Sequence, residues 1–571
     1  MKLLHKHIFR EFAAKKTMMG LLSLVLIFDS FLYFFVRFSV DKNLDIYRNV
    51  GKESLSENGY KYLIALENNK ILIRNMSGAM TFVFAIILFL FIFNIMKHNQ
   101  IKIGNLQSLG FMTKDYAIGC SKVLMCMALP STIIGFVIGF FCSDILILAN
   151  QKTYGVTDLS KGIHITTFLK GTVLLTLLVG AVTFVACIAF KSRDTALLIK
   201  GDDGGASKPG IVERFIGVFH FENAYKYKLT FRNISGFILI LTAISTFSIM
   251  FMLSMSLTGS SKRLVESQLE GRNYLYETSY DDYRKDIISE DIEADYLLKA
   301  PVMIEMSGDD VEYNLIGVDG DGKLFSLMDQ DGDKIDEPAL NGIVINPELA
   351  ENYGVTVGET ITVTIGSEIA DFIVEDIADN AEIKCMYISK KELSSLLGVE
   401  PECYNFVYTC NPLEAGKSVP RSEIIKKLED DQTSNKASAI INQSIGVATG
   451  VLLICLAFFI GLSGNINNVL IFDLLGYDKK KIGQILLDPY IVAGNAIYVL
   501  TIPVCLFFAR KIQITTSLAT GDYMPFVNSG VTYVYMFVIM NLILFLVRAL
   551  FSLKINKIIS GEKQSEYLYE W

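Results

Sequence analysis

Residues 106–116 read LQSLGFMTKDY, and residues 472–482 read FDLLGYDKKKI. Each stretch places apolar residues before a Leu-Gly-aromatic sequence and lysine after it, directly between two long hydrophobic runs. Leu109 in the first stretch and Leu475 in the second are 366 positions apart. Repetition of this kind indicates that one structural unit occurs twice in a chain. We therefore expect a protein built from two related halves.

The hydrophobic runs predict a polytopic α-helical membrane protein. Hydrophobic residues make up 51% of the 571 residues, and the mean hydropathy is +0.40. A transmembrane helix needs about 20 mostly apolar residues, and eight runs of suitable length occur. Because these runs have almost no internal charge, they are unlike the core helices of a large soluble protein. These eight predicted transmembrane helices are 17–38, 77–96, 118–147, 168–190, 236–257, 444–464, 487–509 and 531–552.

The two halves share one order of elements. An amphipathic pattern typical of a helix lying in the membrane surface opens each half, at residues 2–12 and again at 211–233. One predicted span, an external segment and three more spans follow in each case. The assigned regions are an amphipathic cytoplasmic helix (1–16), the first permease half (17–200), a linker with the second amphipathic helix (201–235), the fifth span (236–258), an extracellular α/β domain with stalks (259–436), and the last three spans with a cytoplasmic tail (437–571).

Charge predicts the orientation in the membrane. Cytoplasmic loops carry an excess of Lys and Arg, and basic residues cluster before the first span, between residues 191 and 235, and at Lys479–Lys481. Both termini are therefore expected in the cytoplasm, with residues 259–436 outside the cell. That segment has 38 acidic against 16 basic residues, a net charge of −22. Such a charge attracts cations. The acidic composition therefore has two explanations, which are binding of cationic antimicrobial peptides and solubility alone.

The segment 259–436 is predicted to fold as a mixed α/β domain. Short β-rich runs alternate with turn residues at 316–328, 341–365 and 370–378, while 347–353 and 390–398 have helical patterns. Residues 261–277 and 422–447 are expected to continue the fifth and sixth spans as stalk helices. The external cysteines form no disulfide framework, although a Cys403–Cys410 bridge stays open.

The repeated phrase resembles the signature of the FtsX-like permeases, the membrane subunits of type VII ABC transporters. That signature reads Glu-Ile-Gly-x-Leu-Arg-Ala-Leu-Gly and is followed by a basic segment. Residues 102–110 of this chain read KIGNLQSLG, and residues 468–476 read NVLIFDLLG. Lys102 and Asn468 replace the acidic residue of the family, and Leu470 replaces its internal glycine. Residues 344–365 and 387–398 are similar to the external domain of macrolide-efflux permeases in the same superfamily.

The resemblance implies a permease that transmits movement from a separate ATPase to the external domain. It also implies that this movement exports, extracts or detoxifies peptides or amphipathic compounds, which would give resistance to antimicrobial peptides. ATP and Mg²⁺ would bind to the partner ATPase, expected as a dimer, and this chain would hold no cofactor or metal. Further partners would be membrane lipids, and a second permease or a sensor kinase, but no nucleic acid. The residues expected to couple to the ATPase are Lys102, Gly104, Leu106, Leu109, Gly110, Phe111, Lys114, Phe472, Leu475, Gly476, Tyr477, Lys479 and Lys480.

Other patterns leave alternatives open. The repeated phrase could be only a tight connection whose lysines enforce topology, and the chain could be a signalling scaffold that senses a peptide or controls a cell-wall hydrolase without transport. No P-loop occurs, because Asn411 precedes Gly416-Lys417-Ser418 where a glycine is required, so the chain itself is not expected to be an enzyme.

Two acidic features have structural and functional interpretations. DQDGDKIDE, at 329–337, is either a solvated turn or a calcium loop that lacks EF-hand spacing. Asp29 lies inside the first predicted span, where a carboxylate costs about 3 kcal/mol. It is expected to accept hydrogen bonds within the bundle or to meet Arg37, rather than to serve transport.

Overall fold

The computed structural model divides the chain into two compact units. One contains Met1–Met252, Asn442–Phe508 and Ser529–Trp571, and the other contains Leu253–Ile441 and Ala509–Asn528. We call them the helical unit and the β-rich unit. The structure describes residues 6, 8–10, 12, 16–50, 54–157, 159–189, 234–286, 292–306, 308–320, 322–414, 416–520 and 523–560. The predicted linker with the second amphipathic helix (201–235), apart from Ile234 and Ser235, therefore lies outside the described residues, as do most of the predicted helix 1–16 and the tail after residue 560.

Helices occupy the described residues of the eight hydrophobic runs, with a turn at Ser143 between α5 and α6. Their bounds are α2 (Lys16–Val50), α3 (Glu57–His98), α5 (Thr113–Cys142), α6 (Asp144–Tyr154), α7 (Ile165–Leu169), the π-helix η2 (Lys170–Leu174), α8 (Leu175–Ala189), α12 (Ile234–Ser267), α14 (Arg421–Ser463), α16 (Lys479–Thr520) and α17 (Gly530–Ile559). Among the described residues, seven helices are long and apolar enough to span a membrane. The second run lies in α3, whose apolar stretch by the same measure is the shorter Met80–Phe93. The chain is thus a polytopic helical membrane protein.

Glycines bring the helices of the first half into close contact. Helices α2, α3, α5 and α8 pack against one another, and α5 approaches α2 through Gly135 and Gly139. A Cβ atom on Gly135 would lie 2.6 Å from the carbonyl oxygen of Ile27, and one on Gly139 would lie 2.9 Å from Cβ of Phe34. Two small residues four positions apart are typical of helix pairs in membranes, where close packing drives association.

The second half packs in a similar way. Gly446 and Gly450, also four positions apart, place α14 against Met250 and Phe247 of α12. Aromatic side chains join α14 to the other two helices. The ring of Phe458 lies 5.2 Å from that of Tyr490 on α16 and 5.9 Å from that of Phe551 on α17. Helix α14 therefore contacts the other three helices of the second half.

Two buried carboxylates of α2, Asp29 and Asp41, have partners inside the first half. Asp29 is buried and accepts a hydrogen bond of 3.4 Å from the hydroxyl of Thr81 on α3. This confirms the prediction that Asp29 accepts hydrogen bonds within the bundle. The other, a contact with Arg37, is wrong, because Arg37 pairs at 2.9 Å with Asp41 one turn further along α2. Asp41 also accepts a 2.6 Å hydrogen bond from Thr167 of α7. Both carboxylates therefore hold helices together.

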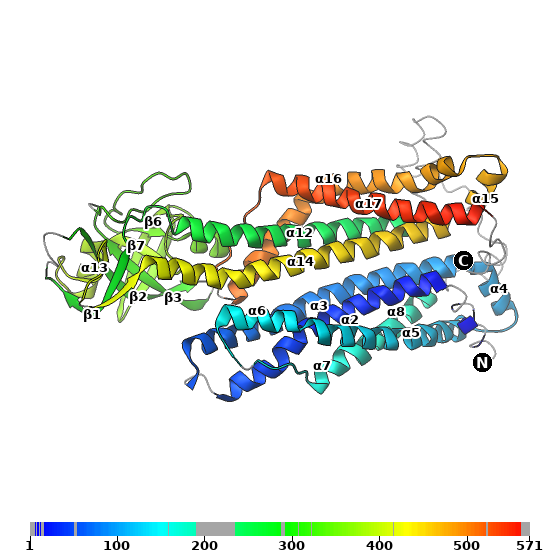
Figure 1. Ribbon diagram of the computed structural model, residues 1–571, viewed down its shortest axis with the longest axis horizontal. Helices are drawn as coiled ribbons and strands as arrows, with labels where there is room; N and C mark the ends of the chain where they lie inside the picture. The colour runs from blue at the N-terminus through cyan, green and yellow to red at the C-terminus, as the bar shows by residue number, and fades with distance from the viewer. Residues whose placement is uncertain are drawn as a thin grey trace. The chain divides into compact units, whose positions relative to one another are not determined.

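The β-rich unit contains one nine-stranded sheet. Its strands are β1 (Tyr276–Arg284), β2 (Ala294–Met306), β3 (Asp309–Val318), β4 (Gly342–Ile345), β5 (Thr360–Ile365), β6 (Glu368–Ile377), β7 (Cys385–Ser389), β8 (Tyr404–Thr409) and β9 (Lys417–Pro420). They lie in the order β3-β7-β4-β6-β5-β2-β8-β1-β9, with a further pairing between β3 and β2. The π-helix η4 (Leu349–Tyr353) and helix α13 (Lys390–Leu397) occupy two segments predicted as helical. Figure 1 shows the sheet and α13 together.

Two predictions for this unit are corrected. The stalk expected over 261–277 ends at Ser267, because Gly271 turns the chain with a φ of +64° and the chain enters β1 at Tyr276. Cys403 and Cys410 are free thiols at opposite ends of β8. Seven steps along an extended strand separate them by about 23 Å, which a disulfide cannot span.

The close approach of α5 to α2 gives a stability prediction. Gly135→Ala places a methyl group against the Ile27 carbonyl, so the helices must separate and unfolding should become easier by about 1–3 kcal/mol. Gly78→Ala on α3 is the control, because nothing lies within 4 Å of its Cβ position. Thermal unfolding of both variants in detergent checks this. Equal midpoints for the two variants would contradict the packing described here.

Candidate functional site

The first copy of the repeated phrase folds as a short helix that ends in a tight turn. Helix α4 (Gln100–Ser108) follows α3, and Gly110 then adopts a φ of +89°. The Phe111 amide donates to the carbonyl of Leu106 at 3.1 Å, and the Gly110 amide donates to that of Gln107 at 3.0 Å. This pair of bonds is the Schellman motif, in which a left-handed residue closes the helix end. We call residues 100–114 the first elbow.

The second copy has the same local structure. Helix α15 (Ile466–Leu474) precedes Gly476, whose φ is +81°. The Tyr477 amide donates to the carbonyl of Phe472 at 3.0 Å, and the Gly476 amide donates to that of Asp473 at 2.9 Å. The rings of Phe472 and Tyr477 also lie 5.4 Å apart, which is the hydrophobic contact that accompanies this motif. Residues 466–480 form the second elbow.

Both elbows present an apolar residue to the exterior at the same position. The residue before each turn glycine is largely exposed, with 74% for Leu109 and 67% for Leu475. Lys114 and Lys480 follow four residues after those glycines and are also exposed. Figure 1 shows α4 and α15 at one end of the helical unit. Exposed leucines beside lysines, repeated on one end, are suited to binding another protein.

A buried residue anchors each elbow, and sequence reasoning did not include it among the site residues. Ile103 of α4 and Val469 of α15 are 2% and 0% exposed, and they occupy equivalent positions of the repeat. The signal available in the sequence was an apolar β-branched residue conserved between the two copies. Gly104 is buried behind the first elbow, whereas its counterpart Leu470 is half-buried, so the two elbows differ on the inward side.

Lys102, Leu106, Phe111 and Lys479 complete the predicted set. Lys102 and Lys479 are exposed, and Leu106 and Phe111 are half-buried in the first elbow. The structure thus brings the thirteen predicted residues into two separate elbows with one shared geometry. Their binding to an ATPase stays a prediction.

In the β-rich unit, an arginine joins the two stalk helices to the sheet. Arg421 is the first residue of α14, and its guanidinium donates to the carbonyls of Gln268, at 3.0 Å, and Leu269, at 3.2 Å, just beyond the end of α12. It also donates to the carbonyl of Arg272 and lies over the ring of Tyr274. Carbonyls at a helix end lack intrahelical partners, so Arg421 ties α12, α14 and the start of the sheet together.

A buried charge network lies next to this junction. The Glu382 carboxylate accepts a hydrogen bond from the Tyr408 hydroxyl at 3.1 Å and forms an ion pair with Lys299 at 3.6 Å. Burial alone raises the pKa of Glu382, but Lys299 and Arg272 hold it below its ordinary value. Burial and the nearby Glu382 raise the pKa of Glu277. The network is a fixed part of the β-rich unit, because breaking a buried ion pair leaves a charge without a partner.

The end of α16 also belongs to the β-rich unit, which the sequence did not indicate. Asn352 of η4 donates to the hydroxyl of Ser517 on α16 at 3.0 Å. The amide of Val527, in the following loop, donates to the hydroxyl of Ser256 on α12 at 3.0 Å. Helix α16 begins three residues after Gly476 of the second elbow and ends in these contacts. No local pattern reports such long-range pairs.

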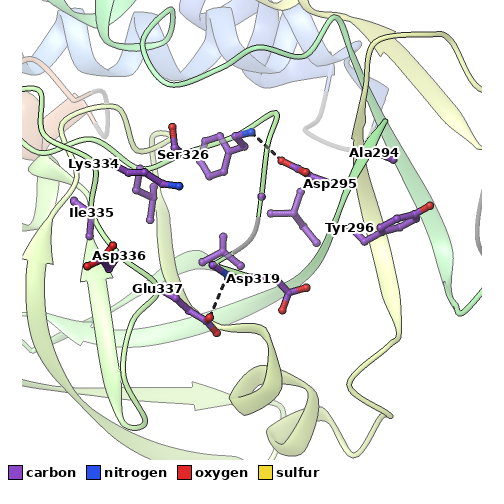
Figure 2. A pocket seen from close by; sticks show the side chains of 15 residues that line it. Ala294, Asp295, Tyr296, Asp319, Ser326, Lys334, Ile335, Asp336 and Glu337 are labelled. Atoms are coloured by element: carbon purple, nitrogen blue, oxygen red, sulfur yellow. Dashed lines mark hydrogen bonds between the residues drawn. The ribbon is translucent and has the colours of Figure 1, made fainter. Parts of the chain in front are cut away.

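The β-rich unit contains a cavity of about 210 Å³. Figure 2 shows Asp295, Asp319 and Glu337 around it. Asp295 accepts hydrogen bonds from the amides of residues 323–325, Glu337 accepts from the Gly320 amide at 3.1 Å, and Asp319 pairs with Lys390 at 3.3 Å. These carboxylates therefore hold the loop 319–337 in place.

The predicted choice between a solvated turn and a calcium loop concerns part of that loop. Asp329 accepts hydrogen bonds from the amides of Asp331, at 2.9 Å, and Asp333, at 2.8 Å. One carboxylate therefore closes the turn. In the described part of the chain, no group of three or more His, Cys, Asp or Glu side chains is placed to hold a metal ion.

Comparison with known proteins matches this chain to no protein-family model and to no curated protein.

The junction gives a prediction for Arg421. Arg421→Met removes hydrogen bonds from a charged donor, worth about 1.5–3 kcal/mol in favourable cases, while it keeps much of the side-chain volume. Amide hydrogen–deuterium exchange at residues 268–275 should become faster. Arg421 binds the carbonyls of this segment, and without that tether the segment opens more often. Lys426→Met, at an exposed position of the same helix, is the control. Unchanged exchange in Arg421→Met would show that the junction does not depend on this side chain.

Proposed function

We propose that this protein is the membrane subunit of an ABC transporter of the FtsX-like type, with eight transmembrane helices in two four-helix halves. A separate ATPase, acting as a dimer with ATP and Mg²⁺, binds the two elbows. The observation that carries the proposal is the pair of elbows, which share one hydrogen-bonded turn and expose Leu109 and Leu475 at equivalent positions. Two matching contact points suit a dimeric partner, since each subunit can contact one of them.

In this proposal the elbows lie in the cytoplasm and the β-rich unit lies outside the plasma membrane. Nucleotide-driven movement of the ATPase shifts the elbows, and helices such as α16 carry the shift outward. Support comes from the course of α16, which starts beside Gly476 and ends at the contact between Ser517 and Asn352. Mechanical transmission of this kind needs no continuous pore. The work is applied to peptides or amphipathic compounds at the outer side.

Replacement of the exposed leucines tests ATPase binding. The double variant Leu109→Glu, Leu475→Glu should reduce co-purification of the ATPase at least about tenfold, and nucleotide hydrolysis by the complex should fall with it. The reason is that a desolvated carboxylate opposes docking by more than 1.4 kcal/mol. Substitution at Gly110 or Gly476 is a poorer test, since positive φ strains any other residue. Leu340→Glu, at a position that is 81% exposed in the β-rich unit, is the control.

Full ATPase recovery with the double leucine variant would refute elbow docking. Loss of the ATPase in Leu340→Glu as well would show that the assay reports folding or expression. Single variants add information, because Leu109→Glu and Leu475→Glu should each remove part of the binding if both elbows are used.

Protease access tests the orientation. A cleavage sequence inserted in the exposed turn after Asp331 should be cut by a protease added to intact cells. The same sequence inserted between Ser108 and Leu109 should be cut only after the membrane is permeabilised. Protection of the Asp331 site in intact cells, or cutting at the elbow without permeabilisation, would contradict the proposed orientation.

A further inference from the structure

The cavity in the β-rich unit has two kinds of wall. Leu297, Val318, Phe325 and Leu327 line it, and all four are buried members of one hydrophobic core. Charged side chains line much of the rest, and most of them belong to the segment 319–337. Apolar walls with a few polar groups are the usual form of a small-molecule site. The cavity therefore has the general character of a binding pocket.

Hydrogen bonds hold the walls of the cavity in a fixed arrangement. Asp295 accepts hydrogen bonds from two loop amides, at 2.8 and 2.9 Å. Glu337 accepts one from the Ser389 hydroxyl at 2.8 Å. The ammonium group of Lys390, whose side chain is only 5% exposed, donates to the carbonyl of Tyr296 at 3.1 Å. A pocket that is already ordered costs less free energy to occupy than one that must first become ordered.

Two opposite charges in the lining are available to a ligand. No hydrogen bond or ion pair joins the Lys334 ammonium group to another residue in the described part of the chain. One carboxylate oxygen of Asp319 pairs with Lys390 at 3.3 Å, and the Asp319 side chain is still 50% exposed. Figure 2 shows Lys334 and Asp319 on different sides of the space between them. A ligand lying there meets a positive charge on one side and a negative charge on the other.

These charges discriminate among small ligands. A simple cation is repelled by Lys334, whereas a simple anion is repelled by Asp319 and by Asp336, which also lines the cavity. A zwitterion, which carries both an ammonium group and a carboxylate, is attracted by both sides. Selection of this kind combines repulsion of the wrong ligand with attraction of the right one.

The size of the cavity restricts the ligand further. The volume is about 210 Å³, whereas sites for drug-sized compounds have volumes of about 300–1,000 Å³. The cavity is therefore too small for the peptides or amphipathic compounds of the proposed function. A single amino acid is a zwitterion of suitable size, and an aliphatic side chain on it would complement the apolar wall.

We propose that this cavity binds a free α-amino acid with an aliphatic side chain. The carboxylate of the ligand pairs with Lys334, and its ammonium group pairs with Asp319. The side chain of the ligand covers the apolar wall at Leu297, Val318 and Leu327. Hydrogen bonds between charged groups are stronger than those between neutral groups. Binding at the cavity requires neither elbow and no ATPase, so it goes beyond the proposed function.

Isothermal titration calorimetry with the full-length chain in lipid nanodiscs tests the proposal. The probe is L-leucine, and titration into empty nanodiscs corrects for binding to lipid. Three comparison compounds each lack one part of L-leucine. Isoamylamine lacks the carboxylate, isocaproate lacks the ammonium group, and glycine lacks the side chain. We expect saturable binding of L-leucine and at least about tenfold weaker binding of each comparison compound.

Matched variants locate the site. Lys334→Met and Asp319→Asn should each weaken L-leucine binding at least about tenfold, because one charge of the ligand then lacks its partner. In Lys334→Met the preference for L-leucine over isoamylamine should also disappear. Lys323→Met removes the same charge from an exposed position of the same loop, outside the cavity lining, and it should change the affinity by less than about twofold.

Hydrogen–deuterium exchange of the unaltered chain is a second measurement, and it needs no variant. Phe325 and Ser326 line the cavity, and the Ser326 amide donates to the Gly271 carbonyl at 2.8 Å. The Phe325 ring lies 5.4 Å from the guanidinium of Arg272. Bound L-leucine should therefore slow amide exchange in the segment 319–337, while exchange in α17 should stay unchanged.

Four results would overturn the inference. Absence of saturable L-leucine binding to the unaltered chain would reject the cavity site, and the proposed function would stand if the ATPase still co-purifies. Equal binding of isoamylamine would show attraction of a cation alone. Equal loss of binding in Lys323→Met and Lys334→Met would show that the net charge of the loop decides. Binding of L-leucine without slower exchange in the segment 319–337 would place the ligand elsewhere.

Discussion

A hydrocarbon interior offers no hydrogen-bond partner to a peptide group, and most of this chain is organised around that constraint. The backbone can cross such a medium only where each amide and carbonyl is paired within the segment. Long helices meet the requirement, and small residues then let them approach, because apolar side chains gain little by leaving lipid for one another. Gly135 and Gly139 in one half, and Gly446 and Gly450 in the other, provide that approach.

The chain can turn sharply only where helices end, and there the final carbonyls need new partners. Both elbows solve this in one way, with a glycine at positive φ and two backbone bonds that close the helix. The side chain before each glycine is then directed away from the bundle. Exposure of Leu109 and Leu475 is thus a consequence of the turn geometry, and it is what makes the elbows suited to docking.

The β-rich unit is held by contacts that are distant in sequence. Arg421 bonds carbonyls about 150 positions earlier, and Ser517 meets Asn352. Three chain segments, α12, α14 and the end of α16, thereby contribute to one unit. Movement of any of these helices would act directly on the sheet.

Several elements were predictable because their signals are local. The membrane class followed from run length and apolar content, and the helical patterns at 347–353 and 390–398 located the segments that form η4 and α13. Strands β1, β2, β7, β8 and β9 lie outside the runs predicted as β-rich, because their pairing partners are distant in the sequence and no local pattern reports them. The stalk over 261–277 was predicted too long, because the helical pattern continues past Ser267 while Gly271 and its tertiary contacts end the helix.

The candidate site was likewise predicted in part from the sequence. The repeated Leu-Gly-aromatic phrase located both elbows, but the buried anchors Ile103 and Val469 became evident only from packing. By itself the sequence determined the membrane class and the internal repeat, because hydrophobic run length and repetition are properties of neighbouring residues. Only the tertiary structure decided that α16 ends within the β-rich unit and that Arg421 joins α12 to α14 there, because those contacts are made between residues far apart along the chain.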